Sequence, residues 1–358
     1  MTTQFDGLRR AHHQPTILVT GGSGVIGSAL LDRLTAGPGR PEVIALVHRR
    51  DIQHPGVRSV RGSVTAPQLG LSAAEYAALA HRVDQVVHAA AIVSFKKSED
   101  HAATNVVGTR EVVQFAERAQ ASLVHVSTAY LHPQDDAANP RTSARYAASK
   151  RAAEQVIRQA SGPTSIVRPS IVIGHSRTGA TTEFQGFYHV LSALRRGMLP
   201  MLPFGSHWPL DLIPCDVVAD GIATILERNL FGRDYWLTAG ARALTVADTV
   251  DLHLDHARAH GIRVDRPRFV APDTYHRLIA PVFLDALPRT MRMAVSSLMD
   301  LFLDYVSMEE PFPSSLDELA AAGAAAPPDF PAAIRASLDF WHRESEAAAA
   351  VEAVEAVA

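Results

Sequence analysis

Short apolar segments alternate with amphipathic helical segments along the first half of the chain. The apolar segments are rich in Val, Ile and Leu, which predicts β-strands that are buried on both faces. The expected strands are TILVTGG at 16–22, EVIALV at 42–47, VRSVRGSV at 57–64, VDQVVHAAA at 83–91, SLVHVST at 122–128 and SIVRPSIVIG at 165–174. The expected helices cover 25–34, about 73–80, 105–120 and 146–159. This order predicts an α/β fold with a doubly wound parallel sheet.

The alternation weakens after His175, which predicts a second, smaller unit. The segment DLIPCDVVADGIATILE at 211–227 is expected to return to the sheet, and YWLTAG at 235–240 is expected to form a late strand. The expected division is a flexible arm at 1–14, a sheet domain at 15–178 and 211–229, a substrate-facing lobe at 179–210 and 230–345, and a low-complexity tail at 346–358.

Composition argues against several kinds of partner. The 358 residues are 47% hydrophobic and 20% charged, with a formal net charge of −3, which gives no electrostatic preference for nucleic acid or an anionic membrane. The single cysteine, Cys215, cannot form an internal disulfide, and the polar first residues do not resemble a secretory signal. No run of about 18 apolar residues predicts a membrane-spanning helix. A cytoplasmic location is therefore the expectation, and no oligomeric state is predicted.

A glycine-rich turn, TGGSGVIG, follows the first expected strand and opens the first expected helix. Glycines at this spacing let the backbone turn sharply and approach a pyrophosphate, while the helix N-terminus supplies unpaired N–H groups for the anion. A purely structural glycine turn is the alternative, which the position between strand and helix disfavours. The predicted dinucleotide contacts here are Gly21, Ser23, Gly24, Val25, Ile26 and Gly27.

Basic residues follow the second expected strand, where many NAD-binding chains carry an acidic residue. His48, Arg49 and Arg50 stand there, with Arg49 predicted as the main contact. An arginine can bind a 2′-phosphate through a bidentate fork, so NADPH is predicted over NADH. A solvated basic loop without a ligand is the alternative.

A tyrosine, a lysine and two hydroxyl residues form the predicted catalytic set. Tyr146 and Lys150 are four residues apart on an expected helix and therefore project from one face. An ordinary tyrosine has a pKa near ~10, which an adjacent ammonium group lowers. Thr128 closes a strand, where its hydroxyl could hold a substrate oxygen, and Ser127 is its neighbour. A solvent-facing Tyr–Lys pair is the alternative for this spacing taken alone.

Together, these features resemble an extended short-chain dehydrogenase/reductase, and within it the thioester-reductase and fatty acyl-CoA reductase (male-sterility) group. The resemblance covers roughly the first two-thirds of the chain and implies a Rossmann-type fold with a smaller C-terminal substrate lobe. It rests, besides Tyr146 and Lys150, on TAPQLGLS at 65–72, VDQVVHAAAIVSF at 83–95, NVVGT at 105–109, HVSTAY at 125–130, RPSIVIG at 168–174 and DLIPCDVV at 211–218.

The resemblance also implies roles for further residues. Asn105 is expected to support the active-site helix, and Lys150 to contact the nicotinamide ribose as well. Cofactor contacts are implied for Ser63, Val64, Ala89, Ala90, Ala91, Asn105, Pro169, Ser170 and Ile171. Where the family usually has Gly-Asp after the third strand, this chain has Gly62-Ser63, which removes a carboxylate expected at the adenine amino group.

The implied reaction is NADPH-dependent reduction of an acyl thioester to an aldehyde, which a second hydride could carry to an alcohol. The thioester would arrive on coenzyme A or on a separate carrier protein. Two other classes stay open: an extended dehydrogenase or epimerase acting on a ketone, hydroxysteroid or sugar nucleotide, and a dinucleotide sensor without turnover. The complete Thr–Tyr–Lys set argues against the sensor.

Two remaining features carry less information. The apolar segment at 275–306 could line an acyl pocket, although core-facing helices of the second lobe are the favoured alternative. Seventeen histidines show no HExxH motif and no Cys/His ligand spacing, so no metal is assigned from the sequence.

Overall fold

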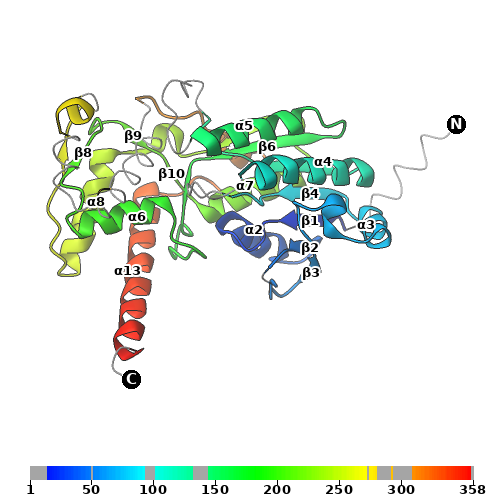
Figure 1. The fold of residues 1–358 in the computed structure, drawn as a ribbon, viewed down its shortest axis with the longest axis horizontal. Coiled ribbons are helices and arrows are strands. Elements are labelled where there is room, and N and C mark those ends of the chain that lie inside the picture. Colours follow the sequence, from blue (N-terminus) through cyan, green and yellow to red (C-terminus); the bar gives the residue numbers. More distant parts are fainter. Residues whose placement is uncertain are drawn as a thin grey trace.

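A parallel sheet of seven strands forms the centre of the computed structural model, in the order β11-β6-β5-β4-β1-β2-β3 (Figure 1). The structure describes residues 14–49, 51–92, 101–131, 144–271, 274–279, 292 and 309–355. The strands are β1 (Thr16–Thr20), β2 (Glu42–Val47), β3 (Val57–Arg61), β4 (Gln85–His88), β5 (Ser122–Val126), β6 (Thr164–Pro169) and β11 (Asp234–Leu237). The predicted doubly wound α/β fold is confirmed.

Alternate residues of each central strand enter two different cores. Ile17 and Val19 of β1 belong to the core beneath α2 and α7, whereas Leu18 between them belongs to the core beneath α4. Strands that are buried on both faces must be apolar throughout, which explains the continuous Val/Ile/Leu runs. The helices of the first face are α2 (Val25–Thr35), α7 (Cys215–Glu227) and α12 (Leu316–Ala321); those of the second are α3 (Ala73–Ala80), α4 (Gly108–Ala119) and α5 (Ala144–Arg158).

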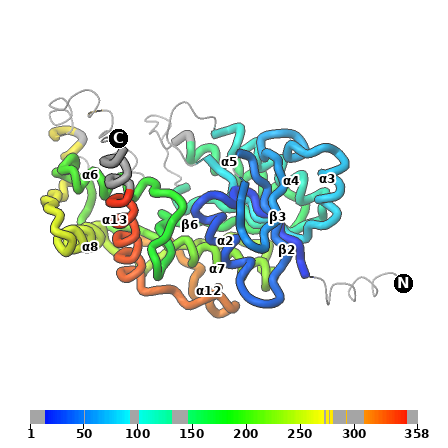
Figure 2. The backbone as a smooth tube through the Cα atoms, turned by 90° about the horizontal axis from the view of Figure 1, so that it is seen from below, coloured from blue at the N-terminus to red at the C-terminus, as the bar shows by residue number. Residues whose placement is uncertain are grey.

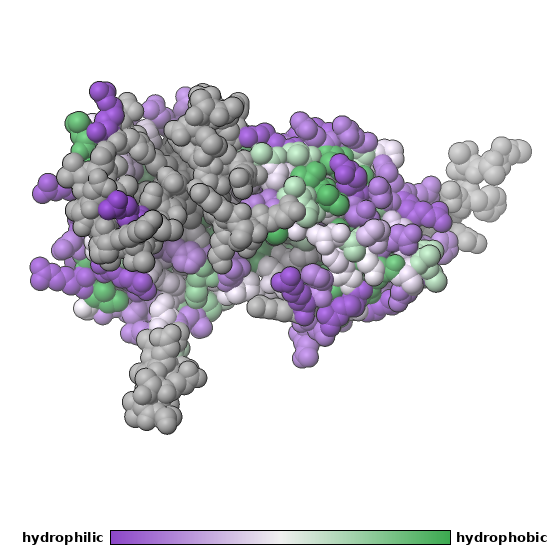
Figure 3. Space-filling view, in the orientation of Figure 1, coloured by the Kyte–Doolittle hydropathy of each residue, from purple (hydrophilic) through white to green (hydrophobic). Residues whose placement is uncertain are grey.

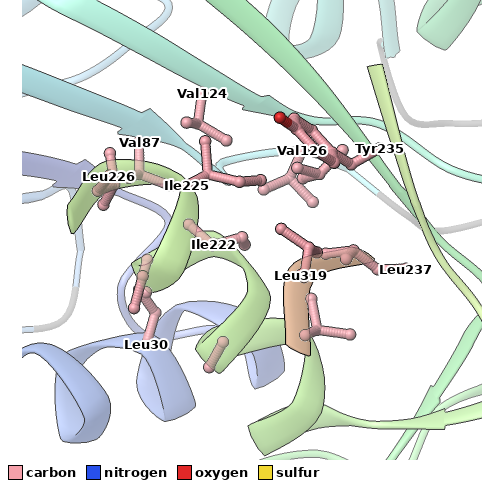
Figure 4. Packing of buried hydrophobic residues seen from close by; sticks show 14 of the residues in the cluster. Leu30, Val87, Val124, Val126, Ile222, Ile225, Leu226, Tyr235, Leu237 and Leu319 are labelled. Atoms are coloured by element: carbon pink, nitrogen blue, oxygen red, sulfur yellow. The ribbon is translucent and has the colours of Figure 1, made fainter. Parts of the chain in front are cut away.

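Figure 4 shows the first core from close by. Leu30 of α2 and Ile222 of α7 meet beneath the strands, and Leu319 of α12 closes the cluster beside Leu237 of β11. The segment at 211–227 therefore does return to the sheet, mainly as the helix α7 that packs on α2.

The expected strand at 165–174 is divided in the structure. β6 ends at Pro169, and β7 (Ile171–Ile173) leaves the main sheet to pair with β10 (Leu212–Pro214). The predicted late strand is confirmed as β11, which pairs with β6. Residues 230–345 are expected from the sequence in the second lobe, but residues 234–237 complete the main sheet, where β11 covers the outer edge of β6.

The second lobe packs helices around a separate apolar cluster (Figure 2). Its helices are α6 (Gly186–Arg195), α8 (Val246–Ala259) and α13 (Phe330–Glu355), and its short strands are β8 (Met201–Leu202), β9 (Pro209–Leu210), β12 (Leu244–Thr245) and β13 (Arg268–Phe269). α13 includes part of the expected tail. Most of the expected arm, Arg50 and nearly all of the apolar segment at 275–306 lie outside the described residues.

Short helices of other types connect these elements. They are the 3₁₀ helices at Pro67–Gly70 and Gly240–Arg242 and the π-helices at Ala102–Val107 and Tyr275–Ile279. On the face seen in Figure 3, hydrophilic residues cover much of the described surface at the right-hand end, over the sheet domain. Among the described residues, every helix is too short or too polar to cross a bilayer.

A buried ion-pair cluster joins α5 to the last two strands of the sheet. Arg168 of β6 donates to both carboxylate oxygens of Glu154, at 2.9 and 2.6 Å, and its Nη2 lies 2.9 Å from Asp234 of β11. The side chains of Arg168 and Glu154 are only 10% and 9% exposed. Each buried charge therefore depends on the other for compensation.

We predict that Arg168→Met lowers the free energy of unfolding by roughly 3 kcal/mol, because it leaves the Glu154 carboxylate buried without its main partner. Urea denaturation measures this change. The control is Arg258→Met, which removes an exposed pair with Asp255 on α8 and should cost less than about 1 kcal/mol. Equal losses in the two variants would contradict the assignment of Arg168 as a structural centre.

Candidate active site

Two adjoining cavities lie along the carboxyl ends of the central strands. The first has a volume of about 510 Å³ and the second about 250 Å³, and both are lined by Gly21, Gly24, Ala89 and Ala91. Together they form one crevice at the end of β1 and β4. In open α/β sheets, this is the edge at which ligands bind.

The glycine turn brings main chain against main chain at the centre of this crevice. Gly21 has a φ of +76°, and a Cβ there would lie 2.5 Å from the carbonyl carbon of Ala89. A Cβ on Gly27 would lie 2.1 Å from the Gly21 oxygen, so only glycine lets α2 begin this close to β1. The N-terminus of α2 thereby faces the crevice with its unpaired N–H groups. These residues fit a dinucleotide pyrophosphate.

The first cavity collects the residues predicted for the adenosine half. Ser23, Ala90, His48, Arg49, Ser63 and Val64 line it. The Ser63 hydroxyl lies 2.9 Å from the Thr65 hydroxyl, which also lines the cavity and was not predicted. Arg61, likewise not predicted, donates to the His48 carbonyl oxygen at 2.9 Å and holds the basic loop after β2.

The second cavity collects the predicted catalytic residues. Ser127, Thr128, Tyr146 and Lys150 line it, together with Val25, Ile26, Gly27, Pro169, Ser170 and Ile171. Thr128 follows β5, whereas Tyr146 and Lys150 come from α5. The structure therefore brings the strand-end hydroxyl and the Tyr–Lys pair to the same cavity that the glycine turn lines.

The ammonium group of Lys150 is almost completely buried. Lys150 is only 2% exposed, and its Nζ donates a hydrogen bond to the Val126 carbonyl oxygen at 2.7 Å. Burial lowers the pKa of Lys150 to about 8, and the Glu154 carboxylate opposes this change. Lys150 therefore remains mostly protonated at neutral pH, which allows it to stabilise a nearby phenolate.

Asn105 lies in the π-helix before α4 and lines neither cavity. Its Oδ1 accepts from the Ile92 N–H at 2.8 Å, and its Nδ2 donates to the Ser149 hydroxyl at 3.0 Å. Because Ser149 precedes Lys150 on α5, Asn105 ties this helix to the chain after β4. This arrangement agrees with the supporting role that the resemblance implied.

Several residues that line the cavities were not predicted from the sequence. Glu183, Gln185 and Phe187, at the start of α6 and just before it, line the second cavity, as does Tyr130, while Thr104 lines the first. Residues 183–187 belong to a segment without a recognisable motif, and only the path of the second lobe brings them to the crevice. Among these residues, only Tyr130 lies in a motif that was recognised in the sequence, at the end of HVSTAY.

One protein family matches the part of the chain that carries the predicted catalytic residues. The sequence model of the family described as male sterility protein matches residues 52–222. The matched stretch is similar to the male sterility protein family. It contains all four predicted catalytic residues, and the resemblance to that group of extended short-chain dehydrogenases/reductases is confirmed. Together with the glycine turn, this match supports a nicotinamide cofactor.

Curated relatives and a solved structure extend the similarity beyond the matched stretch. The chain is 30% identical over 259 residues to a hybrid PKS-NRPS synthetase of Xenoacremonium sinensis, covering 64% of this chain and 6% of that protein. It is 31% identical over 186 residues to a ceramide reductase of Caulobacter vibrioides, covering 52% of this chain and 53% of that protein. The crystal structure of the terminal R domain from the myxalamid PKS-NRPS biosynthetic pathway superposes with a TM-score of 0.71 and 26% identity, covering 93% and 92% of the two chains.

We predict that Gly27→Ala and Gly24→Ala have different effects. Gly27→Ala should lower the free energy of unfolding by roughly 3 kcal/mol, because the new methyl group overlaps main chain that cannot move independently. Gly24→Ala should change stability by no more than about 1 kcal/mol, since its Cβ would meet only the Gly21 oxygen at 3.4 Å, yet it should weaken dinucleotide binding. Urea denaturation and a fluorescence titration with NADPH measure the two quantities. Unchanged NADPH affinity in Gly24→Ala would argue against a pyrophosphate at the turn.

Proposed function

We propose that the chain is an NADPH-dependent reductase that converts an acyl thioester to an aldehyde. The observation that carries this proposal is the meeting of Thr128, Tyr146 and Lys150 with the glycine turn in one cavity. The match to the male sterility protein family and the similarity to a PKS-NRPS terminal R domain support the thioester as substrate.

The bound dinucleotide supplies the hydride, and the residues of this chain hold the substrate and move its proton. The Thr128 hydroxyl donates to the thioester oxygen and stabilises the negative charge that develops there during hydride transfer. Tyr146 delivers the proton to this oxygen, which gives a hemithioacetal. Collapse of the hemithioacetal breaks the C–S bond and releases an aldehyde and a free thiol.

Lys150 controls the proton transfer by its charge. A buried ammonium group close to Tyr146 favours the phenolate that remains after proton delivery, so it lowers the energetic cost of that step. We also assign to Lys150 a contact with the nicotinamide ribose, and to Pro169, Ser170 and Ile171 the wall beside the nicotinamide. Glu183, Gln185 and Phe187 lie on the lobe side of the same cavity and face the acyl substrate.

The thioester arrives on coenzyme A or on a carrier protein. The chain spans 6% of the length of the hybrid synthetase that it matches, so the carrier-bound form is inferred from similarity to one part of that assembly. A second round of hydride transfer on the released aldehyde would give the alcohol.

We predict that purified protein oxidises NADPH when given acyl-CoA thioesters, with the aldehyde or alcohol identified by mass spectrometry. Tyr146→Phe should lower kcat at least about 100-fold, because it removes the proton donor, while NADPH affinity stays within about twofold. Turnover of ketones or free aldehydes with no turnover of any acyl-CoA or carrier-bound thioester would exclude the thioester reductase. Retained activity in Tyr146→Phe would exclude Tyr146 as the acid.

We predict that Arg49 selects NADPH over NADH. Arg49→Ala should weaken NADPH binding about tenfold or more, since a charge-assisted hydrogen bond to the 2′-phosphate is lost, and should leave NADH binding nearly unchanged. The matched control is Arg58→Ala, which removes an exposed arginine of the neighbouring β3 that lines neither cavity. An equal effect of Arg49→Ala on the two dinucleotides would show that Arg49 does not read the 2′-phosphate.

A further inference from the structure

Histidines and a carboxylate gather between α8 and α13, in the second lobe and away from the crevice. His256 lies in the last turn of α8 and His260 is the C-cap residue of that helix, four residues later, whereas Asp339 and His342 are three residues apart on α13. Figures 1 and 2 show these two helices side by side, and they are in contact. The cluster joins two segments that are far apart in the sequence.

The distances within the cluster suit a metal ion. One potential ligand atom each from His256, His260 and Asp339 lies within 4.8 Å of the other two. The imidazole rings of His256 and His260 have centroids 4.3 Å apart, and His256 Nε2 lies 3.0 Å from an oxygen of Asp339. An ion bound at about 2.0–2.2 Å from each ligand atom could occupy the space between them after small side-chain shifts.

The surrounding hydrogen bonds orient the second histidine for ligation. His260 Nδ1 lies 2.9 Å from the backbone oxygen of His256, which can only accept, so Nδ1 carries the hydrogen and Nε2 keeps its lone pair. Metal-binding histidines are commonly fixed in this way, through a hydrogen bond from the other ring nitrogen. For His256 to ligate through Nε2, the hydrogen now directed at Asp339 must move to Nδ1, and the Arg195 guanidinium, 3.5 Å from Nδ1, must turn aside.

The charges around the cluster both favour and oppose a cation. Arg195 opposes a cation, because its Nη2 lies 3.5 Å from His256 Nδ1, but its guanidinium is held over the Trp341 ring. The Asp339 carboxylate offsets that positive charge.

We propose that His256, His260 and Asp339 bind one divalent transition-metal ion, with Zn²⁺ as the reference ion, and that this ion links α8 to α13. Two imidazoles and one carboxylate form a ligand set that zinc uses with water at the fourth position. Two histidines at i and i+4 on a helix present their rings on one face, as in known zinc motifs. His342 is left out of the ligand set, since its Nε2 faces Glu346 at 3.4 Å.

The site is independent of the proposed reductase chemistry. It lies outside both cavities of the crevice, and its expected effect is on the stability of the second lobe. An ion that binds the folded chain in preference to the unfolded chain raises Tm, and the rise grows with the logarithm of the free ion concentration once this exceeds Kd.

The experiment uses the full chain without an affinity tag, treated with a chelator and then titrated with Zn²⁺ by isothermal calorimetry. We expect one ion per chain and a rise in Tm on zinc addition. Because the loss of outer-shell partners alone costs about 10–100-fold in metal affinity, His260→Ala and Asp339→Ala should each weaken binding at least about 100-fold. His260 is exposed and the Asp339 side chain is 50% exposed, so the variants should fold, which circular dichroism verifies.

The matched control is His189→Ala, which removes an exposed histidine of α6 in the same lobe. It should retain the zinc affinity and the Tm rise of the parent chain. Absence of zinc binding by the parent chain would overturn the proposal. Unchanged affinity in both His260→Ala and Asp339→Ala would also overturn it, since the ion would then be held elsewhere.

Discussion

The close approach of β1 to the chain after β4 is the constraint on which the crevice depends. Gly21 leaves no room for a side chain beside the Ala89 main chain, and Gly27 lets the first turn of α2 rest on the Gly21 carbonyl. As a result, the N-terminus of α2 points along the edge where the central strands end. The two cavities meet at this turn, because both are walled by the same few backbone atoms.

A buried carboxylate joins three segments of the chain beside the second cavity. Asp211 is 3% exposed and accepts hydrogen bonds from the Ser170 hydroxyl and from the N–H groups of Ala239 and Gly240, the latter two at 2.8 Å. Burial raises the pKa of Asp211, and these three donors act against that change. Asp211 thus ties the turn after β11 to the junction of β6 and β7, where Ser170 and Ile171 form part of the cavity wall.

Local sequence was sufficient for the elements of the sheet domain but not for features that depend on distant partners. The apolar run at 42–47 and the helical pattern at 73–80 coincide with β2 and α3. The division of the strand at Ser170 was missed, because it depends on Asp211, far along the chain. The proximity of His256 and His260 to Asp339 could not be predicted from the sequence for the same reason, since Asp339 lies on α13.

The residues of the candidate site were likewise predictable only where they lie close together in the sequence. Residues in motifs with fixed spacing, such as Gly21, Tyr146 and Lys150, could be named in advance, whereas Glu183 and Gln185 could not, because their position depends on how the second lobe folds back. A sequence motif identifies only those site residues that lie within one supersecondary unit, such as a strand, its turn and the following helix. The wall that faces the substrate is built by segments without such a motif, so its residues can be identified only from the three-dimensional structure.

The stability of the sheet and the charge of Lys150 are linked through one carboxylate. Glu154, one turn after Lys150 on α5, forms its hydrogen bonds with Arg168 and also raises the pKa that burial lowers at Lys150. Without this negative charge, nothing would offset the effect of burial to the same degree, and the pKa of Lys150 would fall further. A neutral lysine would lose its electrostatic effect on Tyr146. The ion-pair cluster that joins α5 to β6 therefore also maintains the charge that the proposed proton transfer requires.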